Sequence, residues 1–198
     1  MTERICIFGD SIVWGAVDSL GGWASRLRSH FEKDSDIEVY NLGISGNTSE
    51  DLVKRIEEEA KARNTELIII AIGANDSAYD SKKKNKIPLE EYEKNLREIL
   101  NISRKYADKI ILVSPINVDE KRTMPVFWNK EKFLDNKTIE NYGKVVKKLA
   151  SKEKIGFIDL FGSLEDEDLE DGLHPNSKGH EKIFLKVKDY LIENKLIN

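Results

Sequence analysis

The sequence predicts an α/β fold, a three-layer αβα sandwich built around a five-stranded parallel sheet. Five short apolar runs are rich in isoleucine and valine and mostly unalternated, which is typical of parallel strands covered on both faces. Segments with helical periodicity separate these runs, and such a β-α repeat predicts helices on both sides of the sheet. We expect the flavodoxin-like strand order 2-1-3-4-5, because right-handed crossovers leave few topologies.

The expected strands and helices follow one another in regular order along the chain. The strands are the runs Ile5–Phe8, Ile37–Asn41, Leu67–Ile72, Ile110–Ser114 and Ile155–Leu160. Each helix is predicted by apolar side chains that recur at three- and four-residue intervals and so share one stripe. These stripes are Leu20, Trp23, Leu27 and Phe31; Leu52, Val53, Ile56 and Ala60; Leu89, Tyr92, Leu96, Ile99 and Leu100; Ile139, Tyr142, Val146, Leu149 and Ala150; and Ile183, Phe184, Val187 and Leu191. Because no linker or internal repeat interrupts the 198 residues, we expect a single domain spanning 1–198.

The composition narrows the class of protein. The formal net charge is −4, which gives no reason to expect binding to nucleic acid or to an anionic membrane. The longest apolar stretch is far shorter than the roughly 20 residues that cross a bilayer, and the first apolar run is too short for a signal-peptide core. We therefore expect a soluble, cytoplasmic protein without a transmembrane segment. The single cysteine, Cys6, rules out an internal disulfide and is expected to be a buried apolar residue.

Four polar or glycine-rich turns each follow a predicted strand. They are Gly9-Asp10-Ser11, Gly43-Ile44-Ser45-Gly46-Asn47-Thr48, Gly73-Ala74-Asn75-Asp76 and Asp171-Gly172-Leu173-His174-Pro175. In open α/β sheets, ligands bind at the carboxyl ends of the strands, and in a parallel sheet these ends lie on one edge. We therefore expect the four turns to converge, although the sequence scatters them.

The residue types in these turns suit nucleophilic catalysis. A serine hydroxyl needs a base within hydrogen-bond reach, and the base needs an orienting partner. Ser11, His174 and Asp171 can fill these roles, because a tight loop can bring Asp171 to a histidine three residues later. The backbone N–H groups of Ser11 and Gly46 and the side-chain amide of Asn75 are candidate donors to the oxyanion of acyl transfer. Each turn taken alone is also an ordinary loop signal, so the interpretation depends on all four together.

The four blocks resemble those of the SGNH-hydrolase superfamily, also called GDSL esterases and lipases. The four residues that name the family are matched here by Ser11, Gly46, Asn75 and His174. The acid of the family lies three residues before its histidine, where this chain has Asp171, and the residue after the serine is Ile12 rather than leucine. The resemblance covers nearly the whole chain. It implies a flavodoxin-like sheet, hydrolysis of a small-molecule carboxylic ester through an acyl-serine intermediate, and neither a metal nor another cofactor.

The sequence defines the substrate less well. Candidate pocket walls are four aromatic side chains, which can equally pack in the core or at the surface. They are Trp14, Tyr79, Phe127 and Trp128. The acidic stretch 165–171 is either a solvated loop or a border of the cleft that disfavours anions. We therefore expect a neutral, short-chain or acetyl ester, with a carbohydrate O-deacetylase, a lysophospholipase, a thioesterase or a non-catalytic ligand-binding relative as alternatives.

The remaining polar features receive no catalytic role. The basic run Lys82–Lys86 is expected to be a solvated turn, His30 to face the dipole at a helix end, and His180 to be a surface or packing residue.

The long connection Asn117–Phe133 is expected either to form a binding loop or to fold its apolar side chains onto the core. A phospho-accepting receiver domain, which shares the fold and the position of Asp10, is disfavoured because its aspartate after the third strand and its lysine after the last strand are missing.

Overall fold

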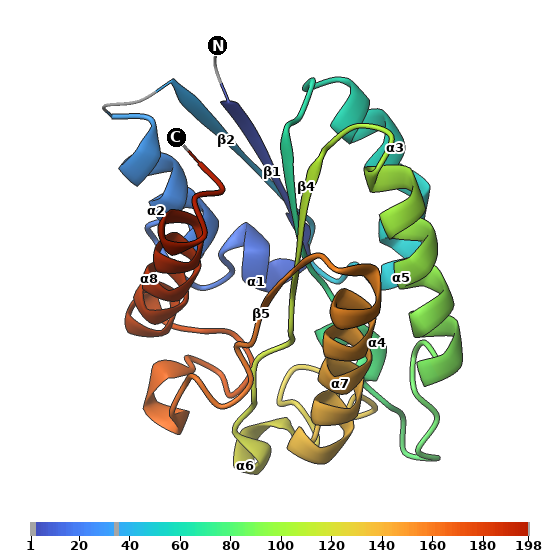
Figure 1. Ribbon diagram of the computed structural model, residues 1–198. Helices are drawn as coiled ribbons and strands as arrows, with labels where there is room; N and C mark the ends of the chain where they lie inside the picture. The colour runs from blue at the N-terminus through green and yellow to red at the C-terminus, as the bar shows by residue number, and fades with distance from the viewer. Residues whose placement is uncertain (1–2, 34–35, 198) are drawn as a thin grey trace.

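A computed structural model describes residues 3–33 and 36–197, and its centre is a five-stranded sheet (Figure 1). The strands run in the order β2-β1-β3-β4-β5, and every neighbouring pair is parallel. Their bounds are β1 (Glu3–Gly9), β2 (Ile37–Gly43), β3 (Leu67–Ala71), β4 (Lys109–Val113) and β5 (Gly156–Ile158). This topology confirms the predicted fold class and strand order. The ends of the predicted domain, Met1 and Asn198, lie outside the described residues.

Helices cover both faces of the sheet and form the two outer layers (Figure 1). One layer contains α2 (Gly22–Phe31) and α8 (Ser177–Glu193), and the other contains α3 (Ser49–Lys61), α5 (Leu89–Ser103) and α7 (Asn136–Glu153). Short helical turns occupy the connections: α1 (Ser11–Trp14), α4 (Ala74–Ser77), α6 (Glu120–Thr123) and the 3-10 turn η1 (Asp166–Asp168). The sequence did not predict these short elements, because a single turn has too few positions to show a periodic pattern.

Side chains of each strand alternate between two hydrophobic cores, one on each face of the sheet. In β1, Ile5 and Ile7 pack with α2 and α8, whereas Cys6 and Phe8 pack with α3 and α5. Both faces are therefore apolar, which explains why the strands appear as unbroken apolar runs in the sequence. Cys6 is fully buried, as predicted, and burial raises the pKa of its thiol to about 11.

Two predicted boundaries are wrong. Leu20 lies before α2 and exposes 64 % of its surface, although its stripe was expected to be helical. Gly21 and Gly22 both have a φ of 76°, a left-handed backbone conformation that lets the helix begin later than the apolar pattern suggests. The last strand is shorter than predicted, because β5 pairs with β4 only over Gly156–Ile158.

The strands run downward in Figure 1, and α4, α6 and the loop after β5 lie in the lower part of the view, beyond the strand ends. The connection 117–133 lies in this region and divides its apolar side chains. Val126 is buried in a third apolar cluster beside Leu134, whereas Phe127 and Trp128 are exposed. Each of the two expectations for this segment therefore describes part of it.

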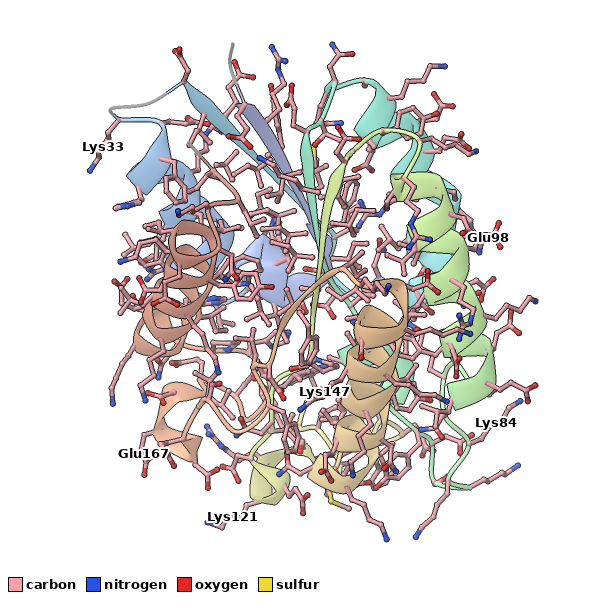
Figure 2. The ribbon with its side chains drawn as sticks, viewed as in Figure 1. Lys33, Lys84, Glu98, Lys121, Lys147 and Glu167 are labelled. Carbon is pink, nitrogen blue, oxygen red and sulfur yellow. The ribbon has the colours of Figure 1, made fainter. Side chains whose placement is uncertain are left out.

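Charged side chains surround the fold, and the labelled lysines and glutamates in Figure 2 project from its periphery. Lys84 is one of them, and it belongs to the basic run Lys82–Lys86. This run starts as an exposed turn in which the Asp80 carboxylate accepts the backbone N–H groups of Lys82 and Lys84. Among the described residues, no helix combines the length and the apolar character needed to cross a membrane.

Candidate active site

Ser11 is the first residue of α1, directly beyond the carboxyl end of β1. Gly9 permits this tight turn, because a Cβ there would lie 2.3 Å from both the carbonyl oxygen of Ala71 and the Val13 side chain. The Asp10 side chain caps α1 by accepting a 2.9 Å hydrogen bond from the backbone N–H of Ile12. The turn thus holds a largely buried serine at the carboxyl edge of the sheet.

A chain of hydrogen bonds joins Ser11 to the loop before α8. Ser11 Oγ lies 2.9 Å from His174 Nε2, and His174 Nδ1 lies 2.7 Å from Asp171 Oδ2. The other carboxylate oxygen of Asp171 accepts the backbone N–H groups of Leu173 and His174 at 2.9 and 2.8 Å. The loop therefore fixes the carboxylate, and the carboxylate in turn orients the imidazole.

The pKa values of the two carboxylates near these hydrogen bonds shift in opposite directions. Burial raises the pKa of Asp171, but its hydrogen bonds with His174 outweigh burial, and the pKa lies below its usual value. An ionised Asp171 accepts from a protonated Nδ1, which leaves Nε2 of His174 able to accept from Ser11. Asp10, by contrast, has its pKa raised to about 6 because it is buried.

The expected oxyanion donors come from three separate turns. Within residues 3–33 and 36–197, no acceptor takes the backbone N–H of Ser11 or Gly46. Gly46 has a φ of 80°, and a Cβ added to it would meet no atom within 4 Å, so the space before it is open. Asn75 is 6 % exposed, and its Nδ2 donates to the backbone oxygen of Asn47 at 3.1 Å. This bond joins the turns that follow β2 and β3.

Two residues that the sequence analysis did not single out hold these turns together. Lys132 Nζ donates to Asn75 Oδ1 at 2.9 Å. Arg55, on α3, donates to the carbonyl oxygen of Gly9 at 3.1 Å and to the side-chain oxygen of Asn47 at 2.8 Å. No local signal marks either residue, because Lys132 lies 57 positions from Asn75 and Arg55 lies on a helix rich in charges.

A cavity of about 550 Å³ opens beside these donors. Gly46 and Asn75 line it together with side chains from two loops, among them Tyr79, Trp128 and Lys132. The Trp128 ring also stacks on the ring of His174, with the two centroids 5.7 Å apart. Because it borders both the candidate donors and Trp128, which covers the imidazole, this cavity is the candidate substrate pocket.

Two of the four aromatic side chains predicted as pocket walls do not line this cavity. Trp14, on α1, is 56 % exposed, and Phe127 is 66 % exposed and packs edge-on against Trp128. Tyr79 and Trp128 do line it. The sequence could not separate the two pairs, because the direction of an aromatic side chain on a loop depends on the path of that loop.

The acidic stretch 165–171 is absent from the lining of this cavity. Its buried carboxylate, Asp168, pairs with Lys178 and Lys182 of α8, and Arg122 donates to the backbone oxygen of Leu169. The lining of the cavity carries three lysines, Lys84, Lys86 and Lys132, and two acidic residues, Asp80 and Glu131. Of the two alternatives for this stretch, the solvated loop fits exposed residues such as Glu165 and Asp166, because the stretch does not border this cavity.

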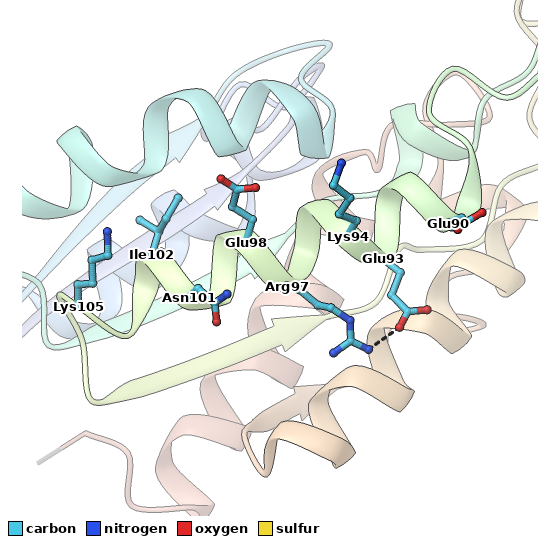
Figure 3. A pocket seen from close by; sticks show the side chains of 8 residues that line it. All are labelled: Glu90, Glu93, Lys94, Arg97, Glu98, Asn101, Ile102 and Lys105. Atoms are coloured by element: carbon cyan, nitrogen blue, oxygen red, sulfur yellow. Dashed lines mark hydrogen bonds and ion pairs between the residues drawn. The ribbon is translucent and has the colours of Figure 1, made fainter.

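A larger cavity, of about 690 Å³, lies on the outer face of α5 (Figure 3). Its lining comes from α5 and the turn after it, and Figure 3 shows Arg97 pairing with Glu93 on the same helix. Its lining includes neither the hydrogen-bonded residues Ser11, His174 and Asp171 nor the candidate oxyanion donors. Alternating charges along one helix are typical of a solvated face, so we assign this cavity no catalytic role.

The other two histidines take no part in the hydrogen bonds that join Ser11, His174 and Asp171. His180 is fully buried on α8, its Nδ1 accepts the backbone N–H of Trp23 at 3.3 Å, and burial lowers its pKa to about 4. It is a packing residue, one of the two roles expected for it. His30, in the last turn of α2, packs edge-on against Phe31 and Phe184. In the part of the chain that the structure describes, no three His, Cys, Asp or Glu side chains form a group able to hold a metal ion.

Comparisons with known proteins bear on this geometry. The model of the GDSL-like lipase/acylhydrolase family matches residues 7–182. The chain is 32 % identical over 204 residues to an acetylxylan esterase of Geobacillus stearothermophilus, with 90 % of this chain and 89 % of that protein covered. It is 29 % identical over 204 residues to the isoamyl acetate-hydrolyzing esterase of Saccharomyces cerevisiae, with 92 % and 82 % covered.

Solved structures of related proteins also resemble this chain. The crystal structure of the acetylxylan esterase of Geobacillus stearothermophilus matches with a TM-score of 0.76 and 28 % identity, over 96 % of this chain and 94 % of that one. Similar structures include catalytic mutants of that enzyme, in which a histidine, a serine or an aspartate is replaced by alanine. The family match spans most of this chain and includes all four polar turns. The chain therefore belongs to the GDSL-like lipase/acylhydrolase family, and it is a carboxylic ester hydrolase.

Proposed function

We propose that the chain hydrolyses small carboxylic esters, acetyl esters above all, with Ser11 as nucleophile, His174 as general base and acid, and Asp171 as the orienting carboxylate. The observation that carries the proposal is the chain of hydrogen bonds from Ser11 Oγ through both ring nitrogens of His174 to Asp171. A serine triad is recognised by this geometry rather than by sequence position. The catalytic mutants of the related acetylxylan esterase replace the same three residue types, which supports the assignment.

Acylation begins when Ser11 Oγ attacks the carbonyl carbon of the ester while His174 Nε2 takes the hydroxyl proton. The carbonyl double bond becomes single, and its oxygen carries the negative charge. The Asp171 carboxylate stabilises the imidazolium that forms. The imidazolium then protonates the alcohol oxygen as its bond to carbon breaks, so that the alcohol leaves and the acyl group stays on Ser11.

Deacylation repeats these steps with water as the nucleophile. Water attacks the acyl carbon and gives a proton to His174 Nε2. When the second tetrahedral intermediate collapses, the bond from carbon to Ser11 Oγ breaks and Oγ takes this proton back. The carboxylic acid leaves, and the protein returns to its starting state.

We assign stabilisation of the oxyanion to the backbone N–H groups of Ser11 and Gly46 and to Nδ2 of Asn75. The absence of an acceptor for the two backbone N–H groups in the described residues supports this role, as does the second proton of Nδ2, which the bond to Asn47 leaves available. The open space before Gly46 supports close approach of a substrate carbonyl. Each such donor is typically worth about 10²–10³ in turnover.

Acetyl esters are the substrate class that the names of the relatives support, since one acts on acetylxylan and another on isoamyl acetate. A carbohydrate O-deacetylase is the second candidate. It is favoured by the two aromatic side chains at the cavity, Tyr79 and Trp128, which offer flat apolar faces to a sugar ring. No observation of this kind favours a lysophospholipase or a thioesterase.

A panel of p-nitrophenyl esters from acetate to laurate tests the proposal. We expect the highest kcat/KM for acetate and a steady fall with chain length, and a fluorophosphonate probe should label Ser11, as identified by peptide mass spectrometry. Acetate release from acetylated xylooligosaccharides with a higher kcat/KM than for p-nitrophenyl acetate would identify the O-deacetylase. An absence of both turnover and labelling would identify a non-catalytic relative.

A further inference from the structure

We propose that Lys132 is a positioning residue that fixes the orientation of the Asn75 amide and strengthens it as an oxyanion donor. This inference rests on the proposed function, since it assumes that Asn75 Nδ2 faces the oxyanion. It adds a positioning residue from the loop between β4 and α7, the loop that also carries Trp128, to a site whose proposed catalytic groups come from the four turns. No other lysine donates to the Asn75 side chain in the part of the chain that the structure describes.

The partners of Asn75 determine which end of its amide points where. Oδ1 accepts from Lys132 Nζ at 2.9 Å, and Nδ2 donates to the backbone oxygen of Asn47 at 3.1 Å. An ammonium group has only donors and a carbonyl oxygen only accepts. If the amide were flipped, its NH₂ group would face the Lys132 ammonium, donor against donor. Its oxygen would face the backbone oxygen of Asn47, acceptor against acceptor. Without Lys132, only the bond to Asn47 would resist the flip.

Both partners of Asn75 are themselves held in place. On one side, Arg55 donates to the side-chain oxygen of Asn47 at 2.8 Å and ties it to α3. On the other side, the backbone N–H of Lys132 donates to Asn129 at 3.0 Å, and its carbonyl oxygen accepts from Val126 at 3.0 Å. The ammonium therefore reaches Asn75 from a backbone with a defined position rather than from a free loop end.

The loop that carries Lys132 is also joined to the segment that follows Asn75. The backbone N–H of Tyr79 donates to the carbonyl oxygen of Phe133 at 3.0 Å, and the reverse bond measures 2.9 Å. The two rings stack with their centroids 5.8 Å apart. This pair of bonds places the residue after Lys132 against a residue four positions after Asn75, so a displacement of one loop would displace the other.

The charge of Lys132 is not neutralised by a short ion pair. In the described residues, its ammonium makes no contact of 4 Å or less with a carboxylate. Lys86 repels it from the same cavity, while Asp10 and Asp171 attract it from greater distances. Lys132 is half-buried, and a charge-assisted bond to Oδ1 polarises the amide so that its N–H groups become better donors. The favourable effect is largest when negative charge develops on the substrate, which predicts an effect on kcat rather than on KM.

Steady-state kinetics with p-nitrophenyl acetate test the inference in four variants. We expect Lys132→Met to lower kcat by about 10-fold to 100-fold with KM nearly unchanged, a loss no larger than the about 10²–10³-fold expected for Asn75→Ala. Lys132→Arg keeps the charge and the donors and should restore most of kcat. Lys130→Met, an exposed lysine two positions away, is the matched control and should behave as wild type.

A double-mutant cycle separates positioning of Asn75 from any independent effect. If Lys132 acts through Asn75, adding Lys132→Met to Asn75→Ala should lower kcat by no more than about twofold. Equal losses in both backgrounds would overturn the inference, and so would a Lys132→Met variant with wild-type kcat while Asn75→Ala is impaired. Wild-type kcat in Asn75→Ala would instead count against the proposed oxyanion role. Thermal unfolding of each variant verifies that it is folded.

The pH dependence of kcat gives a second test, which compares wild type with a variant that keeps the positive charge. Burial and repulsion by Lys86 lower the pKa of Lys132, so wild-type kcat should fall on the alkaline side as the charge is lost. The charged groups nearby are Lys84, Lys86, Asp10, Asp80, Glu131 and Asp171. Lys132→Arg, which stays charged, should show no such fall. Identical alkaline limbs in the two proteins would contradict the inference.

Discussion

The hydroxyl of Ser11 lies 2.9 Å from Nε2 of His174, although 163 positions separate the two residues in the chain. One is supplied by the turn after β1 and the other by the loop before α8, and the parallel sheet brings both to one edge. In the proposed mechanism, proton transfer depends on this distance, and a displacement of about 1 Å can cost about 10²-fold in rate. If Ser11 and His174 act as proposed, the packing of β1 and α8 into one core matters for chemistry as well as for stability.

Replacing the proposed nucleophile should abolish activity and leave the fold intact. Ser11→Ala is expected to lower kcat for p-nitrophenyl acetate by about 10⁴-fold or more, because no second nucleophile takes its place. Its unfolding temperature should stay within a few degrees of wild type. Ser81→Ala, which changes an exposed serine, serves as the control. Initial rates and calorimetry measure both effects, and wild-type turnover in Ser11→Ala would refute the assignment.

An amide in place of the orienting carboxylate should select the wrong tautomer of His174. In Asp171→Asn, a side-chain NH₂ group facing Nδ1 would favour the imidazole with its proton on Nε2, which cannot accept from Ser11. We expect kcat to fall by about 10³–10⁴-fold with a much smaller change in KM. Asp166→Asn, an exposed residue of the same acidic loop, should retain wild-type kinetics. A loss confined to KM would argue for a role in binding.

Two glycines of the site should respond differently to alanine. Gly9→Ala places a Cβ 2.3 Å from the Ala71 carbonyl oxygen, so backbone must move, and we expect a loss of several kcal/mol in the free energy of unfolding, above the about 1–3 kcal/mol typical of overpacking. Gly46→Ala has free space but a φ of 80°, which costs about 1–2 kcal/mol for a residue with a Cβ. Urea unfolding measures both. A larger loss for Gly46→Ala would contradict this account.

Asp76 should make stability depend on pH. Burial raises its pKa to about 6, even though Ser49 donates to Oδ1 from both its N–H and its hydroxyl. The unfolded value is about 3.9, so the folded state binds more protons between these two values. The stability from this group is therefore fully present below about pH 4 and is lost as pH rises through 6, by on the order of 3 kcal/mol.

The comparison of Asp76→Asn with wild type isolates this effect. His180 acts in the opposite sense, because its pKa of about 4 contributes stability above pH 6.5 that is lost as pH falls through 4. The variant keeps Oδ1 as an acceptor and cannot ionise, so its free energy of unfolding relative to wild type should rise from pH 4 to pH 7. Urea unfolding at several pH values measures the difference, and a constant difference would rule out titration of Asp76.

The fold was predictable because its strands are apolar on both faces and its helices carry stripes. The pattern failed at Leu20, where two left-handed glycines delay the helix, and at the one-turn helices such as α1. The single domain over 1–198 and the cytoplasmic location stay predictions. The physical reason for these limits is that a periodic pattern reports burial of regular elements and nothing about short or irregular ones.

The candidate site was predictable where its residues sit in short turns directly after strands. Asp171 and His174 share one loop, so their contact follows from a spacing of three. Lys132 could not be found in this way, because its bond to Asn75 depends on the path of the loop after β4. The same path decides that Trp128 stacks on the imidazole and lines the cavity while Phe127 does not line it. The functional roles of all these residues remain proposals.

The burial of Cys6 makes the protein a convenient host for a spectroscopic reporter. Its thiol is fully covered and stays protonated at neutral pH, so maleimide reagents, which attack thiolates, should leave it unmodified. A substitution such as Phe127→Cys, at an exposed position next to Trp128, would then introduce the only accessible thiol. A fluorophore attached there could follow the entry of substrate in real time, with the native tryptophan beside it as quencher.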